Sequence, residues 1–345
     1  MRTNYLLKKI LSQAKHVISL AAGIKISQQK LLLPFYHVVS NHDLPHIAEL
    51  YPIRNTNAFK QDLKFFTTHY TPVTMQELKE QVKNQQSFNK PSFHLTFDDG
   101  LKEMLTVVAP ILKEQGIPAT FFINSAFVDN KDLFYRYKAS LLIHHLKKYP
   151  PSAILEKEML EVLASAGIQQ SNLRDRLLAV TYAHRNILDR MAALIQYDFA
   201  AYLNTHQPYL TTEDIFKLKE MGFTIGAHSI DHPEYQYISL QEQLRQTKES
   251  MLFLKKAFDL PYAYFSFPFS DENVSKAFFE EIFSSTDSVA DLSFGISGLK
   301  KDSFPRHLHR FPMEGNQQSA EALIKTEYLY YIAKSLIKKN HIIRR

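Results

Sequence analysis

The chain has 345 residues, of which 45% are hydrophobic and 22% are charged, so it can fold around a full core. It has no cysteine, which excludes disulfide bonds and thiolate metal sites. The net charge of +6 gathers at the ends: residues 1–30 hold six basic and no acidic residues, and residues 321–345 hold six basic and two acidic ones. We therefore expect no nucleic-acid partner, and basic ends that suit contact with an anionic membrane surface.

The first 30 residues have the pattern of an amphipathic helix. Apolar residues recur on one face, and lysines lie largely opposite. No run reaches the roughly 18 apolar residues of a transmembrane helix, and no convincing cleavage site follows the short apolar stretch at 17–24. We expect a helix packed on the domain, with an interfacial membrane helix and a cleaved signal as alternatives. In the absence of a clear signal peptide or transmembrane pattern, we expect a cytoplasmic or membrane-peripheral location.

Strand patterns alternate with helix patterns along most of the chain. Strands are predicted at 31–39 (where Pro34 splits the run), 93–97, 119–123, 223–227, 262–267 and 293–296. Helices are predicted at 57–69, 102–115, 211–222, 239–258, 272–283 and 320–337. This alternation indicates a parallel sheet, and the number of units favours an α/β fold of the (β/α) barrel type.

Residues 126–210 break the alternation, because they hold helix patterns and no clear strand. The sequence thus predicts an amphipathic helix region at 1–30, a barrel formed by 31–125 and 211–320, a helical insertion at 126–210 and a basic C-terminal helix at 321–345. Long insertions on functional loops often act as lids or substrate selectors.

Two adjacent carboxylates, Asp98 and Asp99, follow the predicted strand at 93–97. The C-terminal ends of the strands form the catalytic face of an α/β barrel. Burial and mutual repulsion raise the pKa of such a pair unless a cation neutralises it. With a metal bound, one carboxylate can serve as ligand and the other as base, although Asp-Gly is also a common turn.

A histidine pair, His228 and His232, follows the predicted strand at 223–227. Two imidazoles four residues apart can share one metal ion, and Pro233 favours a loop rather than a helix at this point. The chain holds a second such pair, His42 and His46, but it follows no clean strand end and is expected in a surface loop. The first pair has the same strand-then-loop context as the two aspartates.

The stretch Thr96-Phe97-Asp98-Asp99-Gly100, followed by His228-Ser229-Ile230-Asp231-His232, resembles the first two motifs of the NodB-like polysaccharide deacetylases, carbohydrate esterase family 4. The strand at 119–123 is also typical of that family, and the resemblance covers roughly residues 31–315. It implies a distorted (β/α) barrel that holds a divalent metal, usually zinc. Cobalt, nickel and iron also suit an Asp-His-His site.

The resemblance assigns Asp99, His228 and His232 as metal ligands and Asp98 as the general base. The implied reaction is removal of N-acetyl groups from a glycan, in which the metal activates water and the base takes its proton. The later motifs depart from the family pattern. The stretch from Tyr264 to Ser270 lacks the arginine that steadies the base, and the chain has no tryptophan for the fourth motif.

Replacements for the missing parts lie near the C-terminus. Arg310 could steady Asp98 from another strand, or belong to a structural salt bridge. His309 is the predicted general acid, and His307 is its rival. His37, in the first predicted strand, could also reach the barrel mouth.

Two other functions remain compatible with the sequence: a non-catalytic glycan-binding protein on a degenerate barrel, and an O-acetyl ester hydrolase. The insertion carries Phe134, Tyr135 and Tyr137 near its start. These aromatic residues are expected either to stack on sugar rings or to belong to the core. The expected partner in every case is a glycan.

Overall fold

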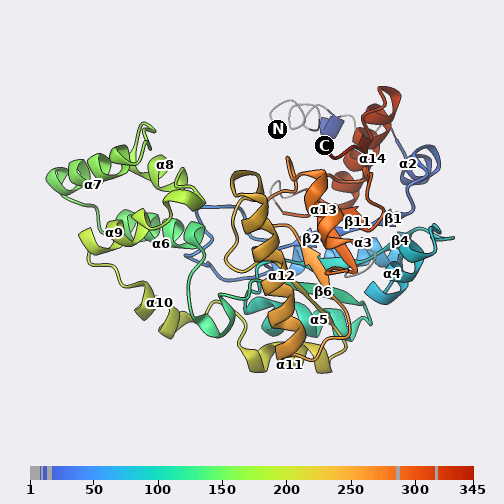
Figure 1. The fold of residues 1–345 in the computed structure, drawn as a ribbon, viewed down its shortest axis with the longest axis horizontal. Helices are drawn as coiled ribbons and strands as arrows, with labels where there is room; N and C mark the ends of the chain where they lie inside the picture. Colours follow the sequence, from blue (N-terminus) through green and yellow to red (C-terminus); the bar gives the residue numbers. More distant parts are fainter. Residues whose placement is uncertain (1–7, 9–10, 14–17, 285–287, 315–317) are drawn as a thin grey trace.

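A computed structural model describes residues 8, 11–13, 18–284, 288–314 and 318–345 (Figure 1). Eight parallel strands form the central sheet, in the order β11-β9-β8-β7-β6-β5-β2-β12. Their bounds are β2 (Pro34–Tyr36), β5 (Leu95–Phe97), β6 (Ala119–Ile123), β7 (Thr224–Ala227), β8 (Tyr264–Ser266), β9 (Leu292–Gly295), β11 (His307–His309) and β12 (Phe311–Pro312).

The sheet closes through a single stretch of chain at residues 307–312. Its first half, β11, pairs with β9, and its second half, β12, pairs with β2 at the other edge of the sheet. Only Arg310 separates the two halves, and its backbone N–H and carbonyl bond to Gly295 and Gly298. The predicted distorted (β/α) barrel is thus confirmed, and the residue at its seam is an arginine.

Helices cover the outside of this barrel (Figure 1). They are α2 (Leu20–Ser27), α3 (Thr56–His69), α4 (Met75–Lys83), α5 (Ala109–Glu114), α11 (Thr212–Glu220), α12 (Leu240–Ala257), α13 (Lys276–Ile282) and α14 (Ala320–Leu336). The predicted start at Thr211 is a capping box with Asp214, which satisfies two backbone N–H groups. Short strands form two further parallel sheets: β1 (Leu31–Leu32), β4 (Ser92–Phe93) and β3 (Thr71–Pro72); and β10 (Lys301–Asp302) with β13 (His341–Ile342).

Several predicted elements differ in detail from the structure. The helix expected at 102–115 is divided into two parts. Its first part is a π-helix, η1 (Met104–Val108), and the α-helix α5 begins at Ala109, with Pro110 in its first turn. Proline has no N–H to donate, which suits such an irregular junction. The helix expected from 272 begins four residues later, since Asn273 has a φ of 62°. Of the amphipathic helix region expected at 1–30, residues 1–7, 9–10 and 14–17 lie outside the described residues, and Leu20–Ser27 form α2.

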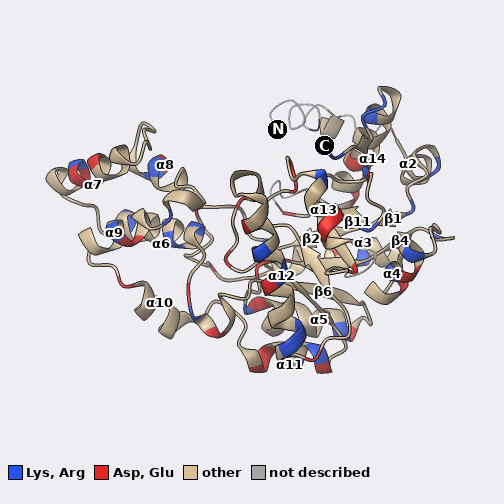
Figure 2. Ribbon diagram, viewed as in Figure 1, with Lys and Arg blue, Asp and Glu red and all other residues tan. Residues whose placement is uncertain are grey.

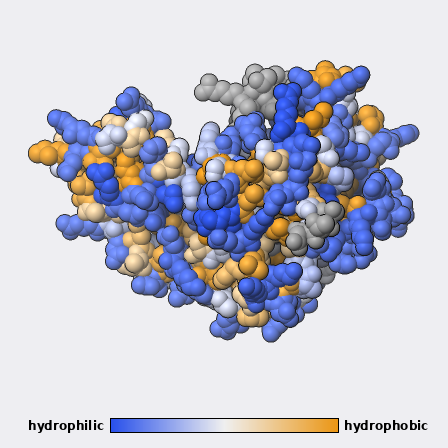
Figure 3. Space-filling model, viewed as in Figure 1, coloured by the Kyte–Doolittle hydropathy of each residue, from blue (hydrophilic) through white to orange (hydrophobic). Residues whose placement is uncertain are grey.

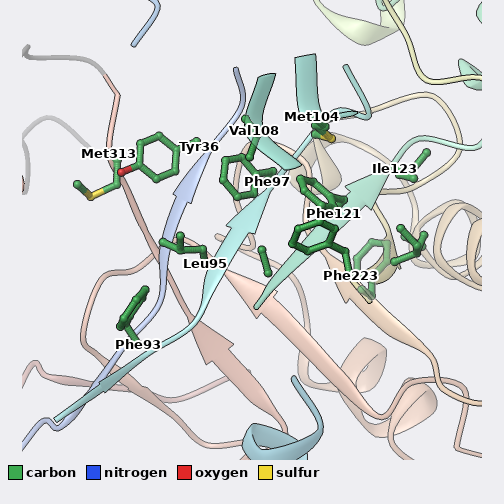
Figure 4. Close-up of a cluster of buried hydrophobic side chains, with 14 of the residues drawn as sticks. Tyr36, Phe93, Leu95, Phe97, Met104, Val108, Phe121, Ile123, Phe223 and Met313 are labelled. Carbon is green, nitrogen blue, oxygen red and sulfur yellow. The ribbon is translucent and has the colours of Figure 1, made fainter. Parts of the chain in front are cut away.

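The barrel core is aromatic. Tyr36 stacks on Phe97 with ring centroids 5.5 Å apart, and Phe97 contacts Phe121 at 5.2 Å (Figure 4). All three side chains are inaccessible to solvent. Contacts between large buried rings hold neighbouring strands in register. The residues that follow each strand are therefore held in fixed positions.

Between β6 and β7 the chain leaves the barrel and forms a helical region, on the left of Figure 1. Its longer helices are α6 (Tyr135–Lys148), α7 (Ala153–Ser165), α8 (Leu173–Leu178), α9 (Ile187–Leu194) and α10 (Phe199–His206), with short 3₁₀ turns η2 (Val128–Asn130) and η3 (Tyr182–His184). This region has a hydrophobic cluster of its own, which Val38, Ile47 and Leu101 of the barrel join. Phe134, Tyr135 and Tyr137 are buried within that cluster, as core residues rather than exposed sugar platforms.

The surface is mixed in character. Outer helices such as α11 carry both basic and acidic residues (Figure 2), and hydrophilic residues cover most of the face seen in Figure 3. Within the described ranges, every helix is too short or too polar to cross a bilayer.

Candidate active site

The two aspartates lie directly after β5, on the C-terminal face of the barrel. Both are buried, with 2% exposure for Asp98 and 4% for Asp99. Asp99 has a φ of 79° and Gly100 a φ of 70°, so the chain turns sharply here in the left-handed region. A non-glycine residue held in this region is strained, and such strain is concentrated at functional sites.

The histidine pair lies in the loop after β7, which is fixed by several hydrogen bonds. The Asn124 side chain donates to the carbonyl of His228, and the His232 N–H donates to Ser229 Oγ at 3.0 Å. Ser229 and His232 both have positive φ, 69° and 64°. Gln246 of α12 accepts from the Ile230 N–H at 2.9 Å. The loop geometry is therefore set by its neighbours β6 and α12.

Asp99, His228 and His232 converge on one point. Asp99 Oδ1 lies 3.5 Å from His228 Nε2 and 3.2 Å from His232 Nε2. Ligands bound to zinc at about 2 Å in a tetrahedron are roughly 3.3 Å apart. Asp99 Oδ1 is buried, and among the described residues it has no hydrogen-bond donor in good geometry. The three residues fit a divalent cation, which would satisfy this oxygen.

The hydrogen bonds around these residues orient them for that role. His228 Nδ1 lies 2.9 Å from the Ser266 carbonyl, which directs Nε2 toward Asp99. Burial lowers the pKa of His228 to about 4, so its ring is neutral at pH 7, as a ligand requires. For Asp99, burial raises the pKa, but the hydrogen bond and charge of His232 outweigh it, and the pKa lies below its usual range.

The helical region supplies part of the site, which sequence reasoning missed. Tyr137 Oη donates to Asp99 Oδ2 at 2.7 Å, and the Phe134 ring lies 4.3 Å from the His232 ring. One oxygen of Asp99 is thus held by α6 while the other faces the histidines. The contact joins residues 38 positions apart on separate elements. No local motif signals it.

Asp98 is held by Arg310. Its two carboxylate oxygens accept from Arg310 Nη1 at 2.8 Å and from Nη2 at 2.7 Å. Burial raises the pKa of Asp98, but the Arg310 charge, followed by that of His228, outweighs it and holds the pKa below its usual range. Arg310 is fully buried between the rings of Phe35 and Phe122. The arginine absent from the third motif thus has a counterpart at the barrel seam.

His37 lies at the end of β2, and its side chain is 26% exposed. Its Nδ1 is 2.5 Å from Glu314 Oε2, while Glu314 Oε1 accepts from the backbone N–H groups of His37 and Val38. Burial lowers the pKa of His37, but Glu314 outweighs it and, with smaller contributions from Asp99 and Asp98, raises the pKa to about 9. The ring is therefore protonated at neutral pH, and the charges of both aspartates contribute to this. Sequence reasoning named His37 but not Glu314, which follows β12 in the same strand-end position.

His309, the predicted general acid, lies in a different cluster. Its Nε2 is 3.2 Å from Asp302 Oδ2, and its rival His307 is 3.2 Å from Asp271. The Arg344 guanidinium pairs with both aspartates and supplies the positive charge of this cluster. Among the described residues, no hydrogen bond or ion pair joins His309 to Asp98, Asp99 or the ligand histidines. This placement argues against His309 as the acid.

The second histidine pair is divided between surface and interior. His42 is exposed, as expected of a surface loop. His46 is 3% exposed, and its Nδ1 bonds to Tyr202 Oη of α10 at 2.8 Å. Burial lowers the pKa of His46 to about 3. His46 therefore has a packing role between the barrel and the helical region.

A family model for polysaccharide deacetylases matches residues 85–172 and 181–279. The chain is similar to the Streptococcus pyogenes deacetylase PplD, solved in complex with acetate, with 16% identity and a TM-score of 0.54 over 86% of this chain and 98% of that one. It is also similar to IcaB from Ammonifex degensii, with 14% identity and a TM-score of 0.53 over 86% and 97% of the two chains. A search of curated proteins gives no match.

Proposed function

The chain belongs to the polysaccharide deacetylase family, and on that premise we propose that it hydrolyses the N-acetyl amide of a glycan at a divalent metal site. One observation carries the proposal: a buried carboxylate, Asp98, is held ionised by Arg310 beside the Asp99–His228–His232 cluster. A protein that only bound glycans would gain nothing from a second buried carboxylate at the metal, because burying a charge is costly.

The proposed ligands are Asp99, His228 and His232. Two imidazoles and one carboxylate suit zinc best, and they leave coordination positions open. When bound, the cation would supply Lewis acidity toward the acetyl carbonyl and acidify a coordinated water. Tyr137 and the Ser266 carbonyl would keep the ligand atoms in place, since such outer contacts fix ligand orientation.

Asp98 is the proposed general base. Each carboxylate oxygen has two lone pairs, so an oxygen bonded to Arg310 can still accept a proton from water. Arg310 keeps Asp98 ionised at neutral pH and fixes its orientation. The water oxygen adds to the acetyl carbon as its proton passes to Asp98.

His37 is the proposed general acid, in place of His309. Glu314 holds the Nδ1 side of the ring, which leaves the Nε2 proton for the leaving nitrogen. The carbon–nitrogen bond breaks as this proton is transferred, and the products are acetate and the amine. A raised pKa suits this role, because the acid must carry its proton at neutral pH.

The first test is acetate release from N-acetylglucosamine oligosaccharides by the purified protein. We expect release that needs a divalent metal, stops with chelator and returns with zinc, and zinc binding that is lost in His232→Ala. Release that persists in chelator, from protein shown to be metal-free, would contradict the metal mechanism. Absence of release from protein with bound zinc, across neutral and charged glycans, would contradict the deacetylase proposal.

The His37–Glu314 pair predicts a specific pH dependence. In metal-free protein, a histidine NMR titration should give His37 a pKa of about 9, and Glu314→Gln should lower this pKa, because burial is then opposed only by the smaller contributions of Asp99 and Asp98. The protonated pair stabilises the fold below about pH 6.5, and this contribution is lost as the pH rises through about 9. In the enzyme, Glu314→Gln should shift the alkaline limb of kcat/KM to lower pH.

Glu213→Gln is the matched control, because it makes the same chemical change at an exposed position on α11, outside the His37 pair. An alkaline limb that stays in place in Glu314→Gln, in a folded and zinc-loaded enzyme, would exclude His37 as the acid.

A further inference from the structure

A groove of about 920 Å³ lies on the same face of the barrel as the proposed site. Its walls come from the loops that follow β7, β8 and β9, together with the end of the chain at Ile342–Arg345. Because the C-terminal ends of the strands form the working face of a barrel, a groove between these loops is placed to hold substrate.

Phe269 joins the groove to the metal ligands. Its ring lines the groove and lies 4.6 Å from the His232 ring. Its φ of 52° is unusual for a bulky residue, so the backbone is strained to place the ring there. Further along, Tyr237 lines the groove and is 73% exposed. These two rings, unlike the buried aromatic residues of α6, are accessible to a sugar chain.

Lysines gather at the far part of the groove, around Tyr330. The Lys8 and Lys300 ammonium groups lie 4.9 Å and 5.8 Å from the centre of this ring, and both residues line the groove. Lys334 lies 5.4 Å from the same ring. Glu327 forms an ion pair with Lys8. Burial, and then repulsion from Lys334 and Lys8, lowers the pKa of Lys300.

Three acidic residues line the groove, against five basic ones: Glu234, Asp271 and Glu272. The charges of Asp271 and Glu272 offset part of the repulsion at Lys300. Asp271 is paired with Arg344, and Glu234 accepts from Tyr135 Oη at 2.8 Å. Arg136 adds a further cation 6.0 Å from the Phe269 ring. Among the described residues, neither Arg136 nor Lys300 is in an ion pair with a carboxylate.

We infer that this groove binds an anionic glycan, with sugars against Phe269 and Tyr237 and a phosphate or carboxylate substituent at Lys300 and its neighbouring lysines. The inference rests on the proposed function and names its substrate class. Crowded ammonium groups repel one another, and an anion between them removes that repulsion. An open groove allows a substituent of a long polymer to reach this point while an acetamido group lies at the metal.

The experiment compares three probes: neutral penta-N-acetylchitopentaose, the same oligosaccharide carboxymethylated, and the same oligosaccharide phosphorylated. Calorimetry on metal-free protein gives Kd, and acetate release from zinc-loaded protein gives KM. We expect at least one anionic probe to bind about tenfold more tightly than the neutral one, with an advantage that shrinks as salt is added. The two anionic probes separate a carboxylate site from a phosphate site.

Lys300→Gln and Arg136→Gln should each weaken binding of the anionic probe several-fold more than binding of the neutral one. Lys157→Gln is the control, because Lys157 is 80% exposed on α7, far to the left in Figure 1. Equal affinity for all three probes, or an anionic preference that survives both substitutions, would overturn the inference. If no probe releases acetate but the anionic preference depends on Lys300, the groove assignment stands and the deacetylase proposal fails.

Discussion

Replacing Asp98 with asparagine is expected to lower kcat/KM for acetate release by roughly 10²–10⁴-fold, the usual contribution of a positioned general base. The amide keeps the size of the carboxylate but cannot take a proton from water. Metal binding should persist, because Asp99, His228 and His232 are unchanged. The measurement is steady-state acetate release together with zinc content, which separates loss of the base from loss of the metal.

Asp291→Asn is the matched control for this substitution. Asp291 immediately precedes β9, so it lies at the opposite end of the barrel, where it pairs with Lys79. Its replacement should leave kcat/KM within a few-fold of the wild-type value. If zinc-loaded Asp98→Asn retained more than about a tenth of wild-type activity, Asp98 would not be the base, and another acceptor would have to be sought near the cluster.

The predicted ligands that the structure brings together are those that one strand and its following residues determine. An apolar strand followed by two carboxylates places them on the C-terminal face of a barrel, whatever the rest of the chain does. The histidine loop follows the same rule. The structure accordingly brings Asp99, His228 and His232 within ligand distance of one another.

His309, the predicted acid, lies in another cluster because its position depends on how the barrel closes. His309 ends β11 and His37 directly follows β2, and either could have reached the mouth. The way the barrel closes determines where each histidine lies. Because β12 pairs with β2, Glu314 lies beside His37. His309 belongs to β11, which pairs with β9, and contacts Asp302. Strand order across a closing edge is set by the whole barrel and has no local signal. For the same reason the contact from Tyr137 to Asp99 could not be read from the sequence.

Replacing Arg310 with methionine is expected to lower the free energy of unfolding of the metal-free protein by about 3–5 kcal/mol, because it leaves the buried Asp98 charge unpaired. Burial would then raise the pKa of Asp98 above its usual value. The loss in free energy of unfolding should therefore grow as the pH rises above about 4. It should become smaller in acid, where Asp98 is protonated. Urea unfolding between pH 4 and pH 8 measures it.

Asp98→Asn removes the charge that Arg310 neutralises, so the double variant Asp98→Asn/Arg310→Met should be less unstable than the two single losses added together. Arg54→Met is the control, since it also leaves a buried carboxylate, Asp62, without its partner. Both arginine variants should lose stability, but only Arg310→Met should lose kcat in the zinc-loaded enzyme, because a protonated Asp98 cannot act as base. If the two folded variants lost kcat equally, Arg310 would have a structural role alone. If only Arg310→Met loses kcat, the arginine at the seam of the barrel has two roles: it joins the two edges of the sheet, and it keeps the proposed base Asp98 ionised.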